Sequence, residues 1–160
     1  MIRPIDRRSD EEIECVAARM RLTLIEVLGE ERGGSLYTME WLIARARFHL
    51  DPEACTGEIF VSIATDGHIS GHTIVRLEPD DAGADIGLFS TIYVEPGSRR
   101  QGVAVRLIER GEEWMRERQL PEAATFTATT NERLHLLFGR LGYACADVGN
   151  GFVRLSKRLA

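Results

Sequence analysis

Residues 92–104 have the sequence Ile92-Tyr93-Val94-Glu95-Pro96-Gly97-Ser98-Arg99-Arg100-Gln101-Gly102-Val103-Ala104, and they decide the fold. The segment Ile86–Val94, which leads into them, is largely apolar on both of its alternating faces. That pattern predicts a central strand that is covered on both sides. A helical pattern of apolar residues begins at Val103. The stretch therefore predicts a buried strand, a short loop broken by Pro96 and Gly97, and the start of a helix.

The loop at residues 99–104 has the features of an anion site. A helix N-terminus carries unpaired N–H groups and a partial positive charge, which suit a phosphate. Gly102 lets the backbone approach an anion closely, and the small Ala104 keeps the first helical turn accessible. From Arg99 to Arg106 there are three arginines and no acid, in a chain whose formal net charge is −5. The sequence therefore predicts a local site for an anionic ligand.

Two common phosphate-binding motifs do not fit this loop. Gly97 and Gly102 have the spacing of the glycines in GxxxxGK[ST], but Val103 and Ala104 stand where the lysine and the hydroxyl are needed. A P-loop NTPase is therefore excluded. No GxGxxG opens a helix here, which disfavours a dinucleotide fold. The remaining interpretation is a pyrophosphate that is held without a metal.

Helical and strand patterns alternate on both sides of this stretch. Downstream, the expected elements are a helix over Val103–Gln119, a strand over Ala123–Thr129, a helix opened by a capping signal at Thr129 and ended by Gly142, and a hairpin of Tyr143–Asp147 with Phe152–Leu159. Upstream, they are a strand over Ile2–Ile5, a helix opened by Ser9 and stopped by Gly29, a polar loop over Gly29–Gly34, a helix over Leu36–Leu50, a hairpin of Glu58–Ala64 with Ile69–Leu77, and an acidic loop over Glu78–Ala84. This order predicts a mixed α/β (α+β) domain with a parallel step in the middle.

Length and composition limit the function classes. A chain of 160 residues predicts one domain over residues 1–160, and 44% hydrophobic with 28% charged residues is an ordinary globular composition. The negative net charge argues against a general partner in nucleic acid or anionic membrane. Cys15, Cys55 and Cys145 form no CxxC, so neither a disulfide framework nor a zinc site is expected. No apolar run suits a signal peptide or a membrane span, so the expected compartment is the reducing cytoplasm.

The sequence resembles the GNAT superfamily of acyl-CoA-dependent N-acetyltransferases. The family signature [RQ]-x-x-G-x-[GA] is matched by Arg99, Gly102 and Ala104, after the strand-like run Ile92–Pro96. Further similar positions are Asn131, Phe138, Arg140 and the pair Gly142-Tyr143. The resemblance covers essentially the whole chain. It implies a GNAT-like mixed sheet, largely antiparallel with a parallel central strand pair, flanked by about four helices.

The resemblance also implies a co-substrate, acetyl-CoA, and the residues that bind it. Backbone groups of Ile92, Tyr93 and Val94 are expected to pair with the pantetheine arm, with the Val94 amide donating to the thioester oxygen. The expected pyrophosphate and charge contacts come from Arg99, Arg100, Gln101, Gly102, Val103 and Ala104, and the remaining cofactor contacts from Asn131, Phe138 and Arg140. No metal is expected, because His68 and His72 have no evident third ligand.

The sequence departs from the family at the catalytic positions. Phe138 stands where members often have a tyrosine that protonates the leaving thiolate. Members often place a base near the positions of Leu88 and Ser90, and neither residue titrates usefully. Other candidates are Asp85 and His72, and His72 is expected to be a partly exposed strand histidine. The catalytic residues stay open, with Ser90 and His72 as the candidates.

Three functions remain in view. The first is an N-acetyltransferase that moves an acetyl group from acetyl-CoA to a primary amine, which belongs to a small molecule, a peptide or a protein. Its acceptor is expected to bind against Leu36–Leu50, Ile69–Leu77 and the acidic loop. The second is a non-catalytic acyl-CoA-binding or sensor module, and the third is an interaction domain. The oligomeric state stays open, with a homodimer as the commonest arrangement.

Overall fold

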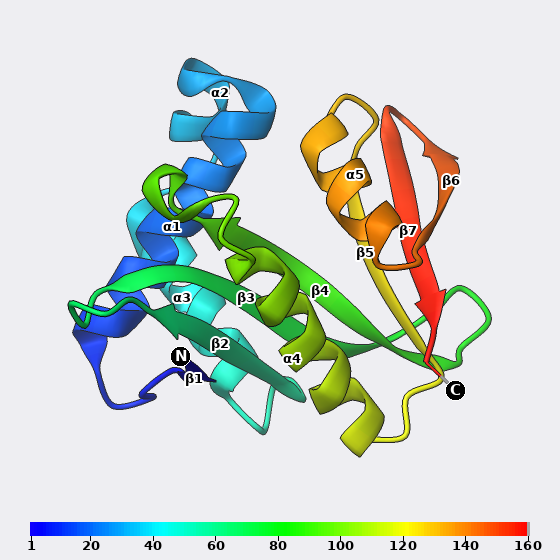
Figure 1. Ribbon diagram of the computed structural model, residues 1–160, viewed down its shortest axis with the longest axis horizontal. Helices are drawn as coiled ribbons and strands as arrows, with labels where there is room; N and C mark the ends of the chain where they lie inside the picture. The colour runs from blue at the N-terminus through cyan, green and yellow to red at the C-terminus, as the bar shows by residue number, and fades with distance from the viewer. Residues whose placement is uncertain (160) are drawn as a thin grey trace.

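A seven-stranded sheet forms the centre of the computed structural model, which describes residues 1–159 (Figure 1). The elements are β1 (Ile2–Pro4), α1 (Asp10–Leu28), α2 (Glu30–Ser35), α3 (Met39–Leu50), β2 (Gly57–Ile63), β3 (Ile69–Pro79), β4 (Asp85–Val94), the 3-10 turn η1 (Pro96–Ser98), α4 (Val103–Glu117), β5 (Glu122–Ala128), α5 (Glu132–Arg140), β6 (Ala144–Gly149) and β7 (Phe152–Arg158). The strand order is β1-β2-β3-β4-β5-β7-β6, with β4 and β5 parallel and the other neighbours antiparallel. The predicted sheet and its parallel central pair are confirmed.

The helices cover the two faces of the sheet and create two cores. Helices α1 and α3 pack on one face, where their apolar residues meet those of β2 and β3. Helices α4 and α5 pack on the other face, around Phe60, Phe89 and Phe138 (Figure 1). Strand β4 is covered on both sides, because it contacts α4 on the face where Phe89 lies and α1 on the other face. The central, doubly covered strand that the sequence predicts is therefore β4.

The expected polar loop over Gly29–Gly34 is wrong, because this segment forms the short helix α2. The reason is close packing against α1. A Cβ atom added at Gly33 would lie 2.5 Å from backbone atoms of Leu24 and Ile25. Glycine at this position thus allows two helix backbones to touch, and the contact holds a segment that its sequence alone would leave irregular. The described chain consequently has five α-helices where about four were expected.

Capping side chains set where two helices begin. Helix α3 was expected from Leu36 but starts at Met39, because Thr38 accepts a hydrogen bond from the Trp41 N–H at 3.0 Å. Helix α5 starts at Glu132 and is capped by Asn131, so the expected cap at Thr129 is wrong. The Thr129 N–H instead donates to the Gly151 carbonyl at 2.8 Å, which ties it to the β6–β7 turn.

Two irregularities of β4 open a cleft in the sheet. Ile74 pairs with Thr91 and Val75 pairs with Phe89, so Ser90 is an extra residue that forms a bulge. In addition, β4 pairs with β5 only at Gly87 and Leu88, near the start of both strands. Beyond these pairs the strands diverge, and Figure 1 shows the gap widening toward α1, α2 and α5.

Candidate functional site

A cavity of about 830 Å³ occupies the space between the diverging strands. Its floor is formed by Ser90, Thr91 and Ile92 of β4. One wall comes from the end of α1 and the link between α2 and α3, and the other comes from β5, the start of α5 and Phe152 of β7. This volume lies in the range of small-molecule sites, and the wall segments come from distant parts of the chain.

The exposed edge of β4 offers backbone groups to this cleft. The Glu95 N–H donates to the Ser70 carbonyl at 2.9 Å, so Glu95 turns its backbone toward β3. Because antiparallel pairing alternates along a strand, the backbone groups of Val94 and Ile92 point away from β3. Strand β5 has already diverged at this level, so neither residue pairs with it; Ile92 lines the cavity, and the Val94 carbonyl accepts from Arg99. This edge suits an extended ligand arm that pairs with backbone.

The start of α4 forms the predicted anion loop. Gly102 has a φ of 77° and precedes the first helical residue, and it has no side chain that could cap the helix. The first N–H groups of α4 are therefore left for another acceptor. A Cβ atom at Gly102 would lie 3.0 Å from the Arg106 guanidinium, which itself donates to the Gln101 carbonyl at 3.1 Å. With Arg100 exposed nearby, the loop fits a pyrophosphate group.

Arg99 is bonded to the end of β4 and to α1, so its charge is only partly available to a ligand. Its Nε donates to the Val94 carbonyl at 2.8 Å, and its guanidinium pairs with the Glu26 carboxylate. The guanidinium also lies 5.6 Å from the centre of the Tyr93 ring. Arg99 thus fixes the end of β4 against α1, and the exposed charge at the loop comes from its neighbours.

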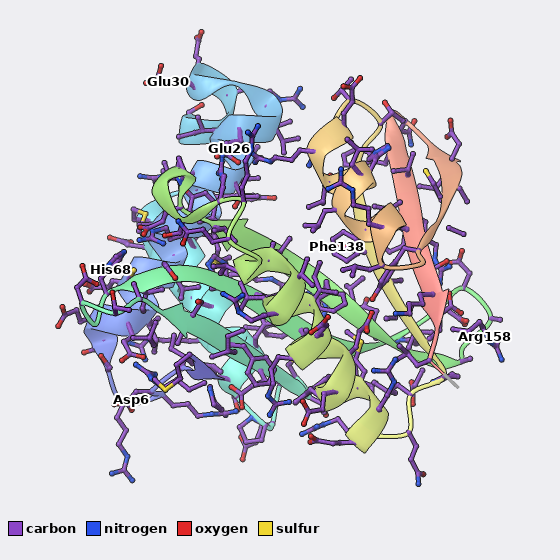
Figure 2. All side chains as sticks on the ribbon, in the orientation of Figure 1. Asp6, Glu26, Glu30, His68, Phe138 and Arg158 are labelled. Carbon is purple, nitrogen blue, oxygen red and sulfur yellow. The ribbon has the colours of Figure 1, made fainter. Side chains whose placement is uncertain are left out.

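Glu26 joins the two sides of the cleft. Besides Arg99, it accepts a hydrogen bond from Arg133 of α5 at 2.7 Å. Figure 2 shows Glu26 on the α1 side of the opening that faces α5. Helix α1, the anion loop and α5 are therefore held together by one carboxylate. Sequence reasoning missed this contact, because the three residues lie far apart in the chain.

His72 is completely buried, so its expected partial exposure is wrong. Burial, helped by the charge of Arg19, lowers the pKa of His72 to about 3. The imidazole is therefore neutral at physiological pH, and it presents no surface to the cleft. Its Nε2 lies 2.9 Å from the hydroxyl of Thr91, which does line the cleft. Thr91 is the one link between this candidate and the cavity, and sequence reasoning missed it.

Ser90 lies on the cavity floor but is bonded to a cation. The Arg76 guanidinium donates to its hydroxyl at 3.4 Å and to His49 Nε2 at 3.0 Å. His49 is buried, and burial lowers its pKa to about 4, so it stays a neutral acceptor. Ser90 can hold a water or an acceptor group. His49 Nε2 already accepts from the same guanidinium, so it is not free to take a proton from Ser90.

The predicted cofactor contacts from α5 are only partly brought to the cleft. Asn131 lines the cavity, and its amide donates to Thr127 at 3.0 Å while its oxygen caps α5. Arg140 is exposed in the last turn of α5 and does not line the cavity. Phe138 is fully buried and packs edge-on against Phe89 and Tyr143, so it offers no surface for a cofactor. The expected contact of Phe138 with the cofactor is therefore wrong, and Figure 2 shows where Phe138 lies.

Restoring the family's tyrosine at this position should harm the protein. We expect Phe138→Tyr to cost about 1–3 kcal/mol of unfolding free energy, because its hydroxyl would be buried without a partner. Urea denaturation measures the loss, and Phe126→Tyr is the matched control, since Phe126 is 49% exposed. Unchanged stability of Phe138→Tyr would contradict this prediction.

The acidic loop over Glu78–Ala84 lies far from the cleft. It joins β3 to β4 at the start of β4, whereas the cavity floor begins at Ser90. None of the residues of this loop lines the cavity within the described chain. The structure therefore places the acidic loop outside this cavity, and its part in an acceptor site stays a prediction.

A model of the acetyltransferase (GNAT) family matches residues 23–143 of this chain. The chain belongs to the GNAT family. The predicted family is thereby confirmed, and the match includes the anion loop, the bulged strand and α5. The expectation of an acyltransferase is confirmed at the level of this family.

A curated relative and two solved structures add detail. This GNAT chain is 32% identical over 76 residues to an aminoglycoside N(6′)-acetyltransferase type 1 from Klebsiella aerogenes, a match of 46% of this chain and 50% of that protein. It thus spans about half the length of that relative. A PaiA N-acetyltransferase from Thermoplasma acidophilum in complex with coenzyme A superposes with a TM-score of 0.78 at 14% identity, covering 99% of this chain and 98% of that one. The acetyltransferase YncA of Salmonella typhimurium, described as putative and solved with acetyl-CoA, has a TM-score of 0.75 at 13% identity, covering 100% and 94%.

The solved neighbours are similar in fold. Their bound coenzyme A and acetyl-CoA are properties of those proteins. Two further observations concern this chain alone. Across residues 1–159, no helix has the length and apolar character that a membrane crossing requires. The same residues contain no group of three or more His, Cys, Asp or Glu side chains arranged to hold a metal.

Proposed function

We propose that this GNAT chain transfers an acetyl group from acetyl-CoA to a primary amine in the cleft between β4 and β5. The observation that carries the proposal is the continuity of two features. The exposed edge of β4 at Ile92 and the side chain of Arg99 line one cavity, and the uncapped N-terminus of α4 follows Arg99 within four residues. A pyrophosphate, an extended arm and an acyl group follow one another in the same order along acetyl-CoA.

Each part of this path has a role in the proposal. Backbone amides of residues 101–104 hold the pyrophosphate, and Arg100 and Arg106 add charge to the loop. The backbone groups of Ile92 and Val94 pair with the pantetheine arm, and the Val94 amide donates to the acyl oxygen. Arg99 and Glu26 hold the loop and the end of β4 in place relative to α1.

Acetyl-CoA supplies an activated acetyl group: the amine nitrogen forms a bond to the acyl carbon, the carbon–sulfur bond breaks with its electron pair on sulfur, and one proton from the amine nitrogen converts the leaving thiolate into the thiol of coenzyme A. The chain's own residues exclude bulk water and orient the amine. A lysine-like ammonium has a pKa of ~10.4, so it must lose a proton before it attacks. The Ser90 and Thr91 hydroxyls on the cavity floor can hold a water that carries this proton outward.

This arrangement predicts a simple pH dependence. His72 and His49, with pKa values of about 3 and about 4, are already neutral above pH 5 and add no inflection between pH 6 and 9. The kcat/KM should instead rise about tenfold per pH unit toward the amine's own pKa. Initial rates of acetylation between pH 6 and 9 measure this. A plateau above about pH 7 would indicate a titrating base and contradict the prediction.

The second function is the non-catalytic acyl-CoA-binding or sensor module. It is favoured by one observation, the lack of a carboxylate or imidazole on the cavity floor formed by residues 90–92. Calorimetric titration with acetyl-CoA, followed by a thiol-release assay with primary amines, separates the two functions. Binding with release of coenzyme A thiol supports the acetyltransferase. Binding without release across the amines supports the sensor, and no binding rejects both.

A further inference from the structure

Large apolar side chains are exposed on both walls of the cleft. Nine such side chains are exposed among residues 1–159, and four of them line this one cavity. Leu36 and Tyr37 are 45% and 37% exposed on one wall, and Phe126 and Phe152 are 49% and 48% exposed on the other. Concentrated exposure of this kind marks a place where apolar groups of a ligand or partner bind.

The first wall is a rigid aromatic surface. The rings of Tyr37 and Trp41 stack with centres 3.9 Å apart and planes 10° apart. The start of the Tyr37–Trp41 segment is fixed, because Thr38 caps α3 and the Tyr37 carbonyl accepts a hydrogen bond from Arg21 at 3.1 Å. Tyr37 lines the cavity with Trp41 stacked on it. A ligand ring would therefore meet a surface that is already ordered.

The second wall is formed by two phenylalanines on neighbouring strands. Phe152 of β7 stands opposite Ala128 of β5, and Phe126 lies two residues before Ala128. Side chains at such diagonal positions share one face of the sheet. Both line the cavity, so this face is directed toward the cleft.

The charges in the cleft do not suit a polycation. Five charged residues line the cavity: Glu26, Arg32, Arg99, Glu132 and Arg133. Arginines outnumber glutamates there by three to two. The carboxylate of Glu26 is also already paired with Arg99 and Arg133. An acceptor with several positive charges would be repelled, whereas a single amine can lose its proton before reaction.

We propose that the acceptor of this GNAT chain is a primary amine that carries an aromatic group, seated between Tyr37 and the pair Phe126 and Phe152. This inference rests on the acetyltransferase function proposed above and adds the substrate class. The same chemistry is present in a free arylalkylamine and in a peptide whose first residue is aromatic. The aromatic group binds between the walls, and the amine extends toward Ser90 and Thr91.

The test compares amines and reads binding separately from transfer. The probes are 2-phenylethylamine, a peptide with an N-terminal phenylalanine, ethanolamine and spermidine. Binding is followed by tryptophan fluorescence with and without coenzyme A, because Trp41 is 43% exposed beside the cleft whereas Trp114 is only 3% exposed. Transfer is followed by thiol release from acetyl-CoA. We expect one of the two aromatic probes to exceed ethanolamine in kcat/KM by about tenfold or more, with spermidine no better than ethanolamine.

Matched variants test whether the preference for aromatic amines depends on Phe126. Phe126→Ala should lower kcat/KM for the preferred aromatic probe by about tenfold and so remove most of its advantage over ethanolamine. Leu136→Ala is the control, because Leu136 is 60% exposed on α5 and does not line the cavity. The preference should be unchanged in this control. Thermal unfolding of both variants verifies that they are folded.

The outcomes separate this inference from the function on which it rests. Preference for the free amine or for the peptide identifies the source of the aromatic group, and either supports the inference. The inference is overturned if 2-phenylethylamine, the peptide and ethanolamine are turned over equally, or if spermidine is preferred. Either result still supports the acetyltransferase function. Saturable quenching of Trp41 by an aromatic probe without any thiol release keeps the aromatic site and overturns the acetyltransferase. If an aromatic probe causes neither quenching nor thiol release, both the aromatic site and the acetyltransferase function are contradicted.

Discussion

Replacing Gly102 by aspartate should weaken the binding of coenzyme A by about a hundredfold or more, as expected when one or two charge-assisted hydrogen bonds are lost. The new side chain would begin 3.0 Å from the Arg106 guanidinium and pair with it. Its carboxylate would also lie beside the N–H groups at the start of α4, where the helix dipole attracts a negative charge. The variant thus places a negative charge on the same donors that the pyrophosphate needs.

The fold should survive this substitution. Gly102 has a φ of 77°, which costs an aspartate about 1–2 kcal/mol. The attraction of the aspartate charge to the helix N-terminus offsets about 0.3–1 kcal/mol of this cost. Stability should therefore change little while affinity is lost, and this separates a local effect from unfolding.

Calorimetric titration with coenzyme A measures the effect, and Gly97→Asp is the matched control. Gly97 lies in the same loop, its φ is not in the left-handed region, and an added Cβ meets nothing within 4 Å. The control adds the same charge but leaves the α4 donors free, so its affinity should fall only a few fold. If both variants lose affinity equally, the loss comes from the added negative charge anywhere in the loop. The assignment of the α4 N-terminus as the pyrophosphate site is then wrong.

The anion loop was predictable because its determinants are local. The end of an apolar strand, Gly102 before a helical pattern and the neighbouring arginines all lie within about a dozen residues of sequence. The structure keeps this unit as predicted, with Gly102 in the left-handed conformation directly before α4. Local sequence therefore determined both the shape of the loop and its charge.

The cleft was not predictable in the same way, because its properties depend on distant contacts. Whether His72 titrates depends on burial beneath α1, and whether Phe138 faces a ligand depends on how α5 tilts onto Phe89. The Tyr37 and Phe126 walls come from segments almost ninety positions apart. Periodicity identifies such residues as apolar. It does not tell which of them remain exposed after the helices have packed.

Loss of the buried carboxylate of Glu112 should be the most destabilising change outside the apolar core. Glu112 of α4 is only 4% exposed and accepts a hydrogen bond from the Tyr143 hydroxyl at 2.6 Å. It also accepts from the Lys157 ammonium of β7 at 3.2 Å. Burial and this carboxylate raise the pKa of Tyr143, so the phenol stays protonated and donates. Glu112→Ala would leave both donors without their acceptor.

We expect Glu112→Ala to lower the unfolding free energy by about 3 kcal/mol, as for other buried pairs broken on one side. Lys157 is 26% exposed and can regain some water, so the effect should lie at the lower end of that range. Glu113→Ala is the control, because Glu113 is 63% exposed and its Arg110 partner lies 3.8 Å away. The control should change stability by less than about 0.5 kcal/mol. Urea denaturation of both variants measures the difference.

The contacts of Glu112 with Tyr143 and Lys157 bear on function because they join α4 to the second half of the sheet. Helix α4 carries the anion loop at one end, while Tyr143 and Lys157 belong to the β5–β7 side of the cleft. Glu112 therefore ties the two sides together on the α4 face, as Glu26 does at the cleft mouth. Folded Glu112→Gln retains an acceptor for Tyr143 and should lose less stability than Glu112→Ala while binding coenzyme A normally. Equal losses in the two variants would show that the charge pair with Lys157, rather than the hydrogen bond from Tyr143, holds α4 to the second half of the sheet.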